Sequence, residues 1–386
     1  MITASSISGP VKEKSLIVRV CVVRHLRSMY LMAFVAAVAG IATLTLRLNE
    51  SRAEHQYEVG CVQLRQHDYI GADRSFDNAI AIQPDQPMFF AARALERSRP
   101  VRATLSVDRP WQHLPAIANA DMLLLQGAAE DYRRALSLSM NDAAFWSNLG
   151  WVEAYLHNDA QALDAFRQAV IVDPMDSTSR VSLGLFYERK GLLEDAHEQY
   201  AYALASSPRM LDSRFFADLT VRDPAGAAMT IGRCLDILAN MPESPLVLAS
   251  IAKVHAYQGH YEAASQELAV ALQGLPDIST AWTTLGLVEL AKSHSDSARL
   301  DFQRALALDP LNRVAVNQLA VIAKSAGNIP LARGLYFDAQ AMPLASKHWE
   351  RTWRIYHVPP VTTNDLIPSN LLEYVGPQLQ PLDMPR

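Results

Sequence analysis

Small and large apolar residues recur along this chain with a period of 34 residues. The register runs without a slip over six consecutive units, 143–346, and appears once upstream over 53–86. The eighth, twentieth and twenty-seventh positions of a unit are mostly small, and the twenty-fourth is large and mostly aromatic. In the unit that begins at residue 143 these positions hold Gly150, Ala162, Ala169 and Phe166. A fixed period of this length predicts a stack of similar supersecondary units.

The spacing predicts that each unit is a pair of antiparallel helices. Two helices approach to within roughly 8–10 Å only where the facing side chains are small, so the Gly and Ala positions mark the closest approach. We expect the aromatic residue to fill the gap between one helix pair and the next. A proline at the thirty-second position stops the second helix, because proline lacks the N–H that a continuing helix needs. These prolines are Pro84, Pro174, Pro208, Pro242, Pro276 and Pro310.

Two units also carry Trp and Leu before the small residue of the first helix. They are Trp146, Leu149 and Gly150 in one unit and Trp282, Leu285 and Gly286 in another. This pattern resembles the tetratricopeptide repeat. The resemblance implies an all-α fold, a right-handed superhelical solenoid of antiparallel helix pairs over 53–346, with about eight repeats. It also implies a protein or peptide partner.

Two stretches depart from the pattern. The unit 211–244 has Asp218, Thr230 and Ile237 where small residues are expected, and is interpreted as a degenerate repeat. Its twenty-fourth position is Cys234, which we interpret as a core residue because a small apolar side chain at this position should be buried.

The second departure is the segment between residues 86 and 143, which holds one repeat and a surplus of residues. Met88–Arg97 is expected to be a first helix, and Ala128, Tyr132 and Ala135 fit a second helix. The surplus falls near 98–118, a proline-rich stretch that cannot be one continuous helix. It is either a tolerated surface loop or a recognition loop.

The N-terminal part of the chain predicts a membrane anchor. Residues 29–46 carry no charge and would extend about 27 Å as a helix, close to the thickness of a bilayer core. The preceding segment, 1–28, holds five basic residues and one acidic residue. By the positive-inside rule this segment is cytoplasmic and the repeats are extracytoplasmic or periplasmic. The alternatives are a signal peptide cut after Ala39 and, less favoured, a buried helix of a soluble domain.

Charge and cysteine content narrow the partners and the chemistry. The chain has 35 basic and 40 acidic residues, and without residues 1–28 the net charge is −9, which disfavours nucleic acid. Cys61 and Cys234 are several repeats apart, so no disulfide is expected between them. The sequence has no phosphate-binding loop and no nucleophile elbow, and we expect no catalytic residue, cofactor, metal site or small-molecule substrate.

The C-terminal part contains His348 and His357 with two tryptophans between them. The spacing of nine does not place the histidines on one helix face, so 347–357 is interpreted as a capping helix over the last repeat. Residues 358–386 are rich in proline and are expected to form an extended tail.

The resemblance also implies where a partner binds. In tetratricopeptide arrays the first helix of each pair lines the concave face, and selected positions of that helix point inward. In this chain those positions hold Trp151, Tyr155, Val181, Leu185, Arg189, Phe215, Leu219, Lys253, Tyr257, Leu287, Leu290, Asn317 and Val321. The Lys and Asn clamp by which some members grip a terminal carboxylate is absent from these positions. An apolar and aromatic strip suits an amphipathic helix or an extended apolar segment.

These features predict a single-pass membrane scaffold with a role in cell-envelope assembly, secretion or export. Two alternatives stay open. One is an accessory subunit of a polysaccharide polymerising or exporting enzyme complex, and the other is an enzyme whose site lies in the insert.

Overall fold

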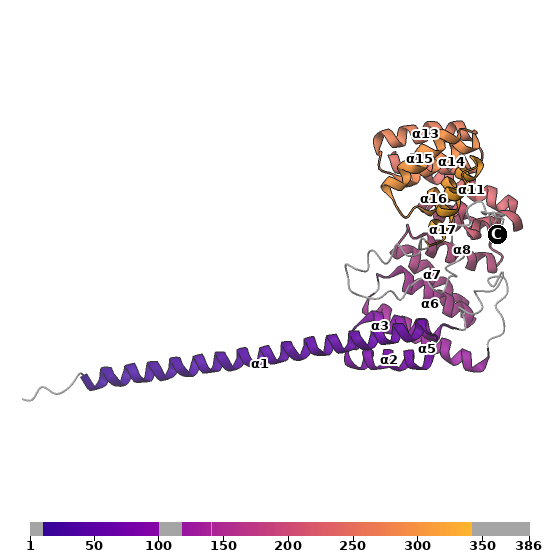
Figure 1. The fold of residues 1–386 in the computed structure, drawn as a ribbon. Coiled ribbons are helices and arrows are strands. Elements are labelled where there is room, and N and C mark those ends of the chain that lie inside the picture. The colour runs from indigo at the N-terminus through magenta and orange to yellow at the C-terminus, as the bar shows by residue number, and fades with distance from the viewer. Residues whose placement is uncertain (1–10, 100–117, 140, 342–386) are drawn as a thin grey trace, which may run out of the picture. The chain divides into compact units, whose positions relative to one another are not determined.

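The computed structural model describes residues 11–99, 118–139 and 141–341, and this part of the chain is helical with no strand (Figure 1). The chain divides into two compact units, Met1–Asp85 and Gln86–Arg386. The predicted all-α fold of antiparallel helix pairs is confirmed. The insert 98–118, apart from its first two residues and its last, lies outside the described residues, as do the capping helix 347–357 and the tail 358–386.

The first unit consists of α1, Val11–Arg65, and α2, Tyr69–Ile82. The C-terminal part of α1 packs against α2, with the rings of Tyr57 and Phe76 6.0 Å apart. The turn between the helices passes through His67 at φ 61°, and the Asp68 side chain caps α2 by accepting from the Gly71 amide. The unit therefore ends in one closed helix pair.

The N-terminal part of α1 carries a run of exposed apolar side chains. Eight of them are 50–68% exposed: Met32, Phe34, Val35, Val38, Ile41, Leu44, Leu46 and Leu48. The predicted span 29–46 lies within this helix, and the side chains of residues 29–31, 33 and 42 lie outside the described set. Over the described residues, no helix contains a stretch with both the length and the hydropathy of a membrane span.

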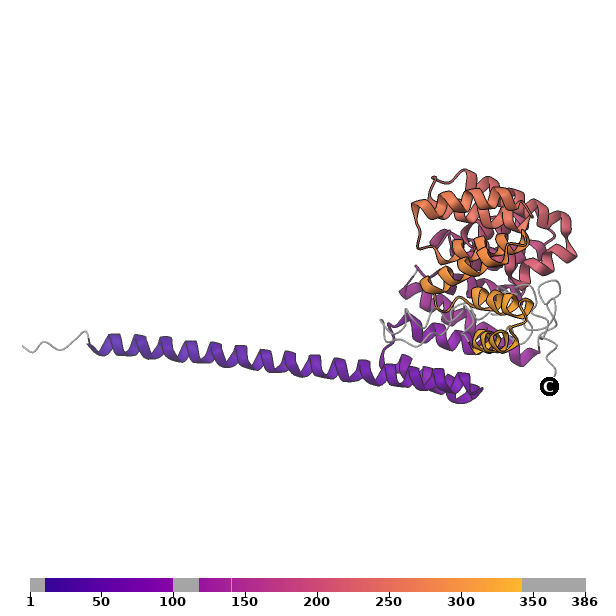
Figure 2. The same cartoon turned by 45° about the horizontal axis from the view of Figure 1, so that its top comes forward.

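The second unit is a stack of helix pairs (Figure 2). Six pairs are regular: α3 Pro87–Arg97 with α5 Asn119–Leu138, α6 Ala143–Tyr155 with α7 Asp159–Val172, α8 Ser177–Arg189 with α9 Leu193–Ser206, α12 Pro245–Tyr257 with α13 Tyr261–Gly274, α14 Ser279–Ala291 with α15 Ser295–Leu308, and α16 Arg313–Ser325 with α17 Ile329–Ala341. In α5 the expected small and aromatic residues, Ala128, Tyr132 and Ala135, are all buried.

In α6, α8 and α14 the glycine at the eighth position of the repeat is covered by the aromatic residue of its own pair. A Cβ atom on Gly150 would lie 2.7 Å from the Phe166 ring, and one on Gly184 would lie 2.3 Å from the Tyr200 ring. The Phe166 ring also lies 5.4 Å from the Phe186 ring of the next pair. The aromatic position therefore closes its own pair as well as the gap between pairs that the sequence predicted.

The recurring Asp-Pro pairs end the second helices. α7 ends at Val172, two residues before Pro174, and the Asp173 carboxylate accepts a hydrogen bond from the Met175 amide at 3.0 Å. Asp309 makes the same contact with the Leu311 amide at 3.1 Å. These carboxylates stabilise the turns between repeats.

The degenerate repeat has its own packing. It consists of a 3-10 turn η1, Pro208–Asp212, a nine-residue helix α10, Arg214–Arg222, and α11, Pro224–Ala239. α11 packs directly against α9, whereas the regular second helices pack mainly on first helices. A Cβ on Gly226 would lie 2.2 Å from the His197 ring, so the missing side chain permits this close approach. Cys234 is fully buried in α11, and burial raises the pKa of its thiol to about 12, so it is a core residue.

Candidate partner-binding surfaces

The predicted concave-face residues all lie on the first helices α6, α8, α10, α12, α14 and α16. Six of them are no more than 2% exposed: Trp151, Tyr155, Val181, Leu185, Phe215 and Leu219. Fully buried side chains cannot contact a partner without rearrangement. In α6, α8 and α10 the expected binding strip is therefore part of the core.

Trp151 illustrates why this strip is buried. Its indole Nε1 donates to the Ser182 Oγ of α8 at 3.3 Å, and its ring meets the Phe166 ring edge-on at 5.3 Å. Similarly, Phe215 lies 4.9 Å from the Tyr200 ring of the preceding repeat. Neighbouring first and second helices thus enclose these side chains.

The other predicted residues on α12, α14 and α16 are at least partly accessible. The exposed fraction of Tyr257 is 41%, and its ring stands edge-on to Phe216. Burial of its hydroxyl end raises the Tyr257 pKa, with Asp212 acting in the same direction. Leu287 and Leu290 are half-buried beside the cluster around Phe302. Lys253, Asn317 and Val321 are also half-buried.

Two polar side chains, Lys253 and Asn317, lie among the apolar residues of α12, α14 and α16. The Lys253 ammonium lies 2.7 Å from the Asp212 carboxylate and is neutralised by it. The Asn317 Oδ1 atom is buried and accepts no hydrogen bond from the described residues. Leu246, at the second position of α12, is 58% exposed. The sequence analysis did not include it among the binding residues, although the second position of a first helix is one of those expected to point inward. We define the concave strip as Leu246, Tyr257, Leu287, Leu290, Asn317 and Val321.

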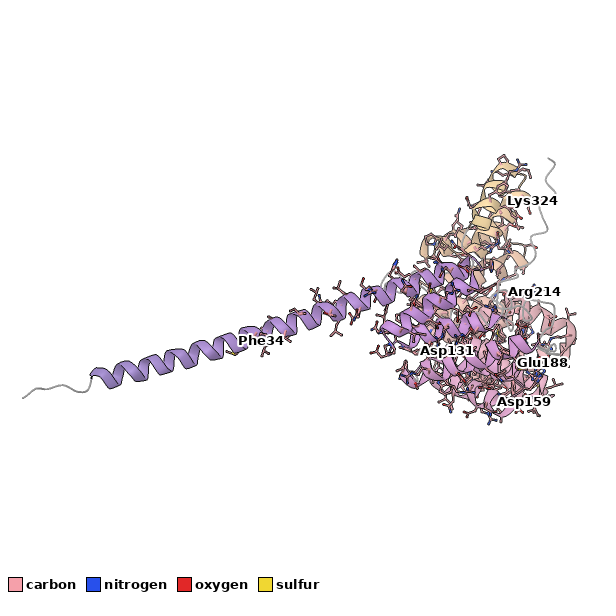
Figure 3. The ribbon with its side chains drawn as sticks, turned by 90° about the horizontal axis from the view of Figure 1, so that it is seen from below. Phe34, Asp131, Asp159, Glu188, Arg214 and Lys324 are labelled. Atoms are coloured by element: carbon pink, nitrogen blue, oxygen red, sulfur yellow. The ribbon has the colours of Figure 1, made fainter. Side chains whose placement is uncertain are left out.

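Arg189 lies between α6 and α8 rather than on an open face. Its Nη2 atom lies 3.3 Å from the Ala154 carbonyl oxygen and 3.4 Å from the Asp159 carboxylate. Its Nη1 atom is buried and has no hydrogen-bond partner in the part of the chain that the structure describes. Desolvation lowers the pKa of this guanidinium. Asp159, which Arg189 contacts, and Glu188, the residue before Arg189 in α8, are labelled in Figure 3.

A buried ionic cluster that the sequence did not reveal joins α8 to α10. Arg222 pairs with Glu188 through two nitrogens and lies 2.9 Å from Asp218. The Tyr200 hydroxyl donates to Glu188 Oε2 at 2.8 Å, and burial raises the Tyr200 pKa. The sequence contains only one indication of this ion pair, which is that Glu188 and Arg222 are separated by one 34-residue period.

A second accessible hollow lies between α9 and α11. It has a volume of about 790 Å³ and is lined by both apolar and acidic side chains, among them Leu192, Leu193, Glu198, Asp236 and Ile237. Sequence reasoning did not find it, because it arises from the irregular packing of α11. Among the described residues there is no cluster of His, Cys, Asp and Glu that could hold a metal ion.

Comparisons with known proteins agree with this architecture. Residues 147–210, 250–312 and 283–345 match the family model described as tetratricopeptide repeat. The human protein named Protein O-mannosyl-transferase TMTC3 is 20% identical over 216 residues, which is 52% of this chain and 24% of that protein. FK506-binding protein-like from Rattus norvegicus is 32% identical over 120 residues, which is 29% of this chain and 35% of that protein.

The chain thus spans only about a quarter to a third of the length of these relatives. Among solved structures, a tetratricopeptide repeat protein from Parabacteroides merdae is 12% identical, with a TM-score of 0.35, and covers 79% of this chain and 98% of its own. The tetratricopeptide repeats predicted from the sequence are confirmed, and they form a scaffold typical of protein–protein interaction.

Proposed function

We propose that this protein is a membrane-anchored repeat scaffold that binds an apolar segment of a partner protein on the concave strip of α12, α14 and α16. The proposal rests on one contrast between the two halves of the stack. The expected binding positions are buried in α6, α8 and α10, whereas Leu246 and Tyr257 on α12 are exposed by 58% and 41%. Partly exposed leucine and aromatic side chains are typical anchors of protein interfaces.

The chemistry of the strip favours a partner segment with apolar side chains and few charges. Lys253 is already paired with Asp212, so it offers no free charge to a carboxylate terminus. No reacting group is required for this function, and the protein is proposed to act without catalysis.

We propose that the N-terminal part of α1 is the membrane anchor. Its apolar side chains between residues 32 and 48 lie on all sides of the helix and are half or more exposed. Side chains of this kind are stable in the hydrocarbon core of a bilayer and unfavourable in water. With 1–28 cytoplasmic, the repeats are extracytoplasmic, and the scaffold serves cell-envelope assembly, secretion or export.

Site-specific photo-crosslinking in intact membranes tests the binding strip. A photoreactive amino acid replaces Leu246 on the strip or, as a control of similar exposure, Leu300 on α15. We expect a discrete adduct from position 246 that disappears when Tyr257→Ala is added, with an unchanged melting temperature. Equal adducts from both positions would contradict the proposal.

A further inference from the structure

The hollow between α9 and α11 lies on second helices, so it is separate from the concave strip on first helices. We call it the seam groove and define it by Leu192, Leu193, Glu198, Asp236 and Ile237. It exists because α11 packs more extensively on α9 than on its own first helix, α10. Gly226 and the buried His197 hold this arrangement, since the His197 ring bonds Thr230 Oγ1 at 3.1 Å and Asp223 Oδ2 at 3.0 Å.

The groove has apolar surface that nothing in the described chain covers. Leu192 and Leu193 are 47% and 51% exposed, and Ile237 is half-buried beside them. Two adjacent half-exposed leucines at the start of a helix leave apolar area in water, which a docking side chain would remove.

The charges around this apolar surface are mostly negative. Arg233 is the single lining cation, and it is already held by Glu194, whose carboxylate it meets at 3.0 Å. Asp195, Glu198 and Asp236 also line the groove. None of them forms an ion pair among the described residues, although Arg180, which lies over the ring of the lining residue Tyr202, interacts electrostatically with Glu198. The groove therefore has a net negative charge of three around an apolar centre.

We propose that the seam groove is a second docking surface, and that its occupant is a short cationic segment of a partner protein in which large apolar side chains alternate with Lys or Arg. The leucines would contact the apolar side chains, and the carboxylates of Asp195, Glu198 and Asp236 would pair with the basic ones. Opposite charges at the edge of an interface set partner choice and association rate, while the apolar centre supplies most of the affinity.

The test uses the full-length protein in neutral detergent micelles and a fluorescent peptide in which lysine alternates with leucine. Anisotropy measures the peptide's Kd, with empty micelles as the blank. Glu198→Gln with Asp236→Asn should weaken binding by about tenfold. Leu193→Ser should weaken it by a similar factor. The control is Glu243→Gln with Asp277→Asn, which removes the same charge from two exposed residues outside the groove, and it should bind as the wild type does.

Each other outcome overturns the proposal. If the control pair weakens binding as much as the groove pair, the peptide responds only to net charge. If a peptide in which lysine alternates with serine binds equally well, the apolar centre has no role. Circular dichroism melts show that all variants are folded, so unchanged binding by the folded groove variants also contradicts a docking site.

Discussion

Glu188 and Arg222 lie one 34-residue period apart and form a buried ion pair that joins α8 to α10. Their side chains are only 9% and 13% exposed, and the Tyr200 hydroxyl completes the cluster. With the His197 contacts to Thr230 and Asp223, the pair links the last regular repeat of the first half to the degenerate repeat by polar groups.

Removing one member of this pair should be much more harmful than removing both. Arg222→Met leaves the Glu188 carboxylate buried without its cation, and we expect the free energy of unfolding to fall by about 3–5 kcal/mol. Glu188→Leu combined with Arg222→Met should recover most of this loss. Chemical denaturation of the single and double variants measures the coupling, and additive losses would contradict it.

The glycines of the first helices should not tolerate even one methyl group. Gly150→Ala would place Cβ 2.7 Å from the Phe166 ring, and we expect a loss of about 1–3 kcal/mol from overpacking. Gly232→Ala on α11 is the matched control, because no atom lies within 4 Å of its Cβ position. This variant should be more stable than the wild type by about 0.5–1 kcal/mol. Equal effects in thermal melts would contradict the packing.

Trp151 and Tyr155 should behave as core residues. Both are buried, at 1% and 0% exposure, so Trp151→Ala should cost about 3–5 kcal/mol. We expect Tyr155→Ala to be similarly destabilising. Val221→Ala, at a residue that is 80% exposed on α10, should leave the melt almost unchanged. If the Trp151→Ala protein were stable but no longer bound its partner, this result would support the prediction from the sequence that Trp151 is a binding residue.

Asp301 should make the repeats more stable in mild acid. Burial raises its pKa to about 6, with Arg304 opposing the shift and Glu289 adding to it. Because the folded state binds this proton more tightly than the unfolded state, Asp301 lowers stability at neutral pH, and the loss is relieved as pH falls from about 7 to 4. The effect is at most about 3 kcal/mol. Asp301→Asn should raise stability at neutral pH and flatten the pH dependence of urea unfolding, and an unchanged profile would contradict this.

Topology can be tested with a reporter that is active only in the cytoplasm. The basic excess before residue 29 and the exposed apolar side chains of α1 lead us to expect no signal from a fusion after Arg386. A fusion at the N-terminus should be active and serves as the control. A strong signal from the C-terminal fusion would reverse the orientation and the proposed compartment.

The sequence predicted the helix pairs well because their packing is local. Gly150 and Phe166 lie in one repeat, and their contact depends on a spacing that is visible in the chain. The Asp-Pro turns are similarly determined by adjacent residues such as Asp173.

The candidate surfaces were harder to predict because exposure depends on neighbouring repeats. Trp151 is on the expected helix face, yet the hydroxyl of Ser182 and the ring of Phe166 surround it. The seam groove depends on α11 lying against α9, which follows from Gly226 and His197 rather than from any periodic position. Positional rules thus locate a residue on a helix but not its final neighbours.

The irregular packing of α11 also affects how the stack unfolds. Repeat arrays are stabilised only by contacts between adjacent units, so cooperativity passes along them one interface at a time. At the degenerate repeat this transmission relies on a nine-residue first helix, the packing of α11 on α9 and a few buried polar contacts. We therefore expect the stack to open first at this junction when it is pulled or heated, with α3–α9 and α12–α17 as the two segments on either side.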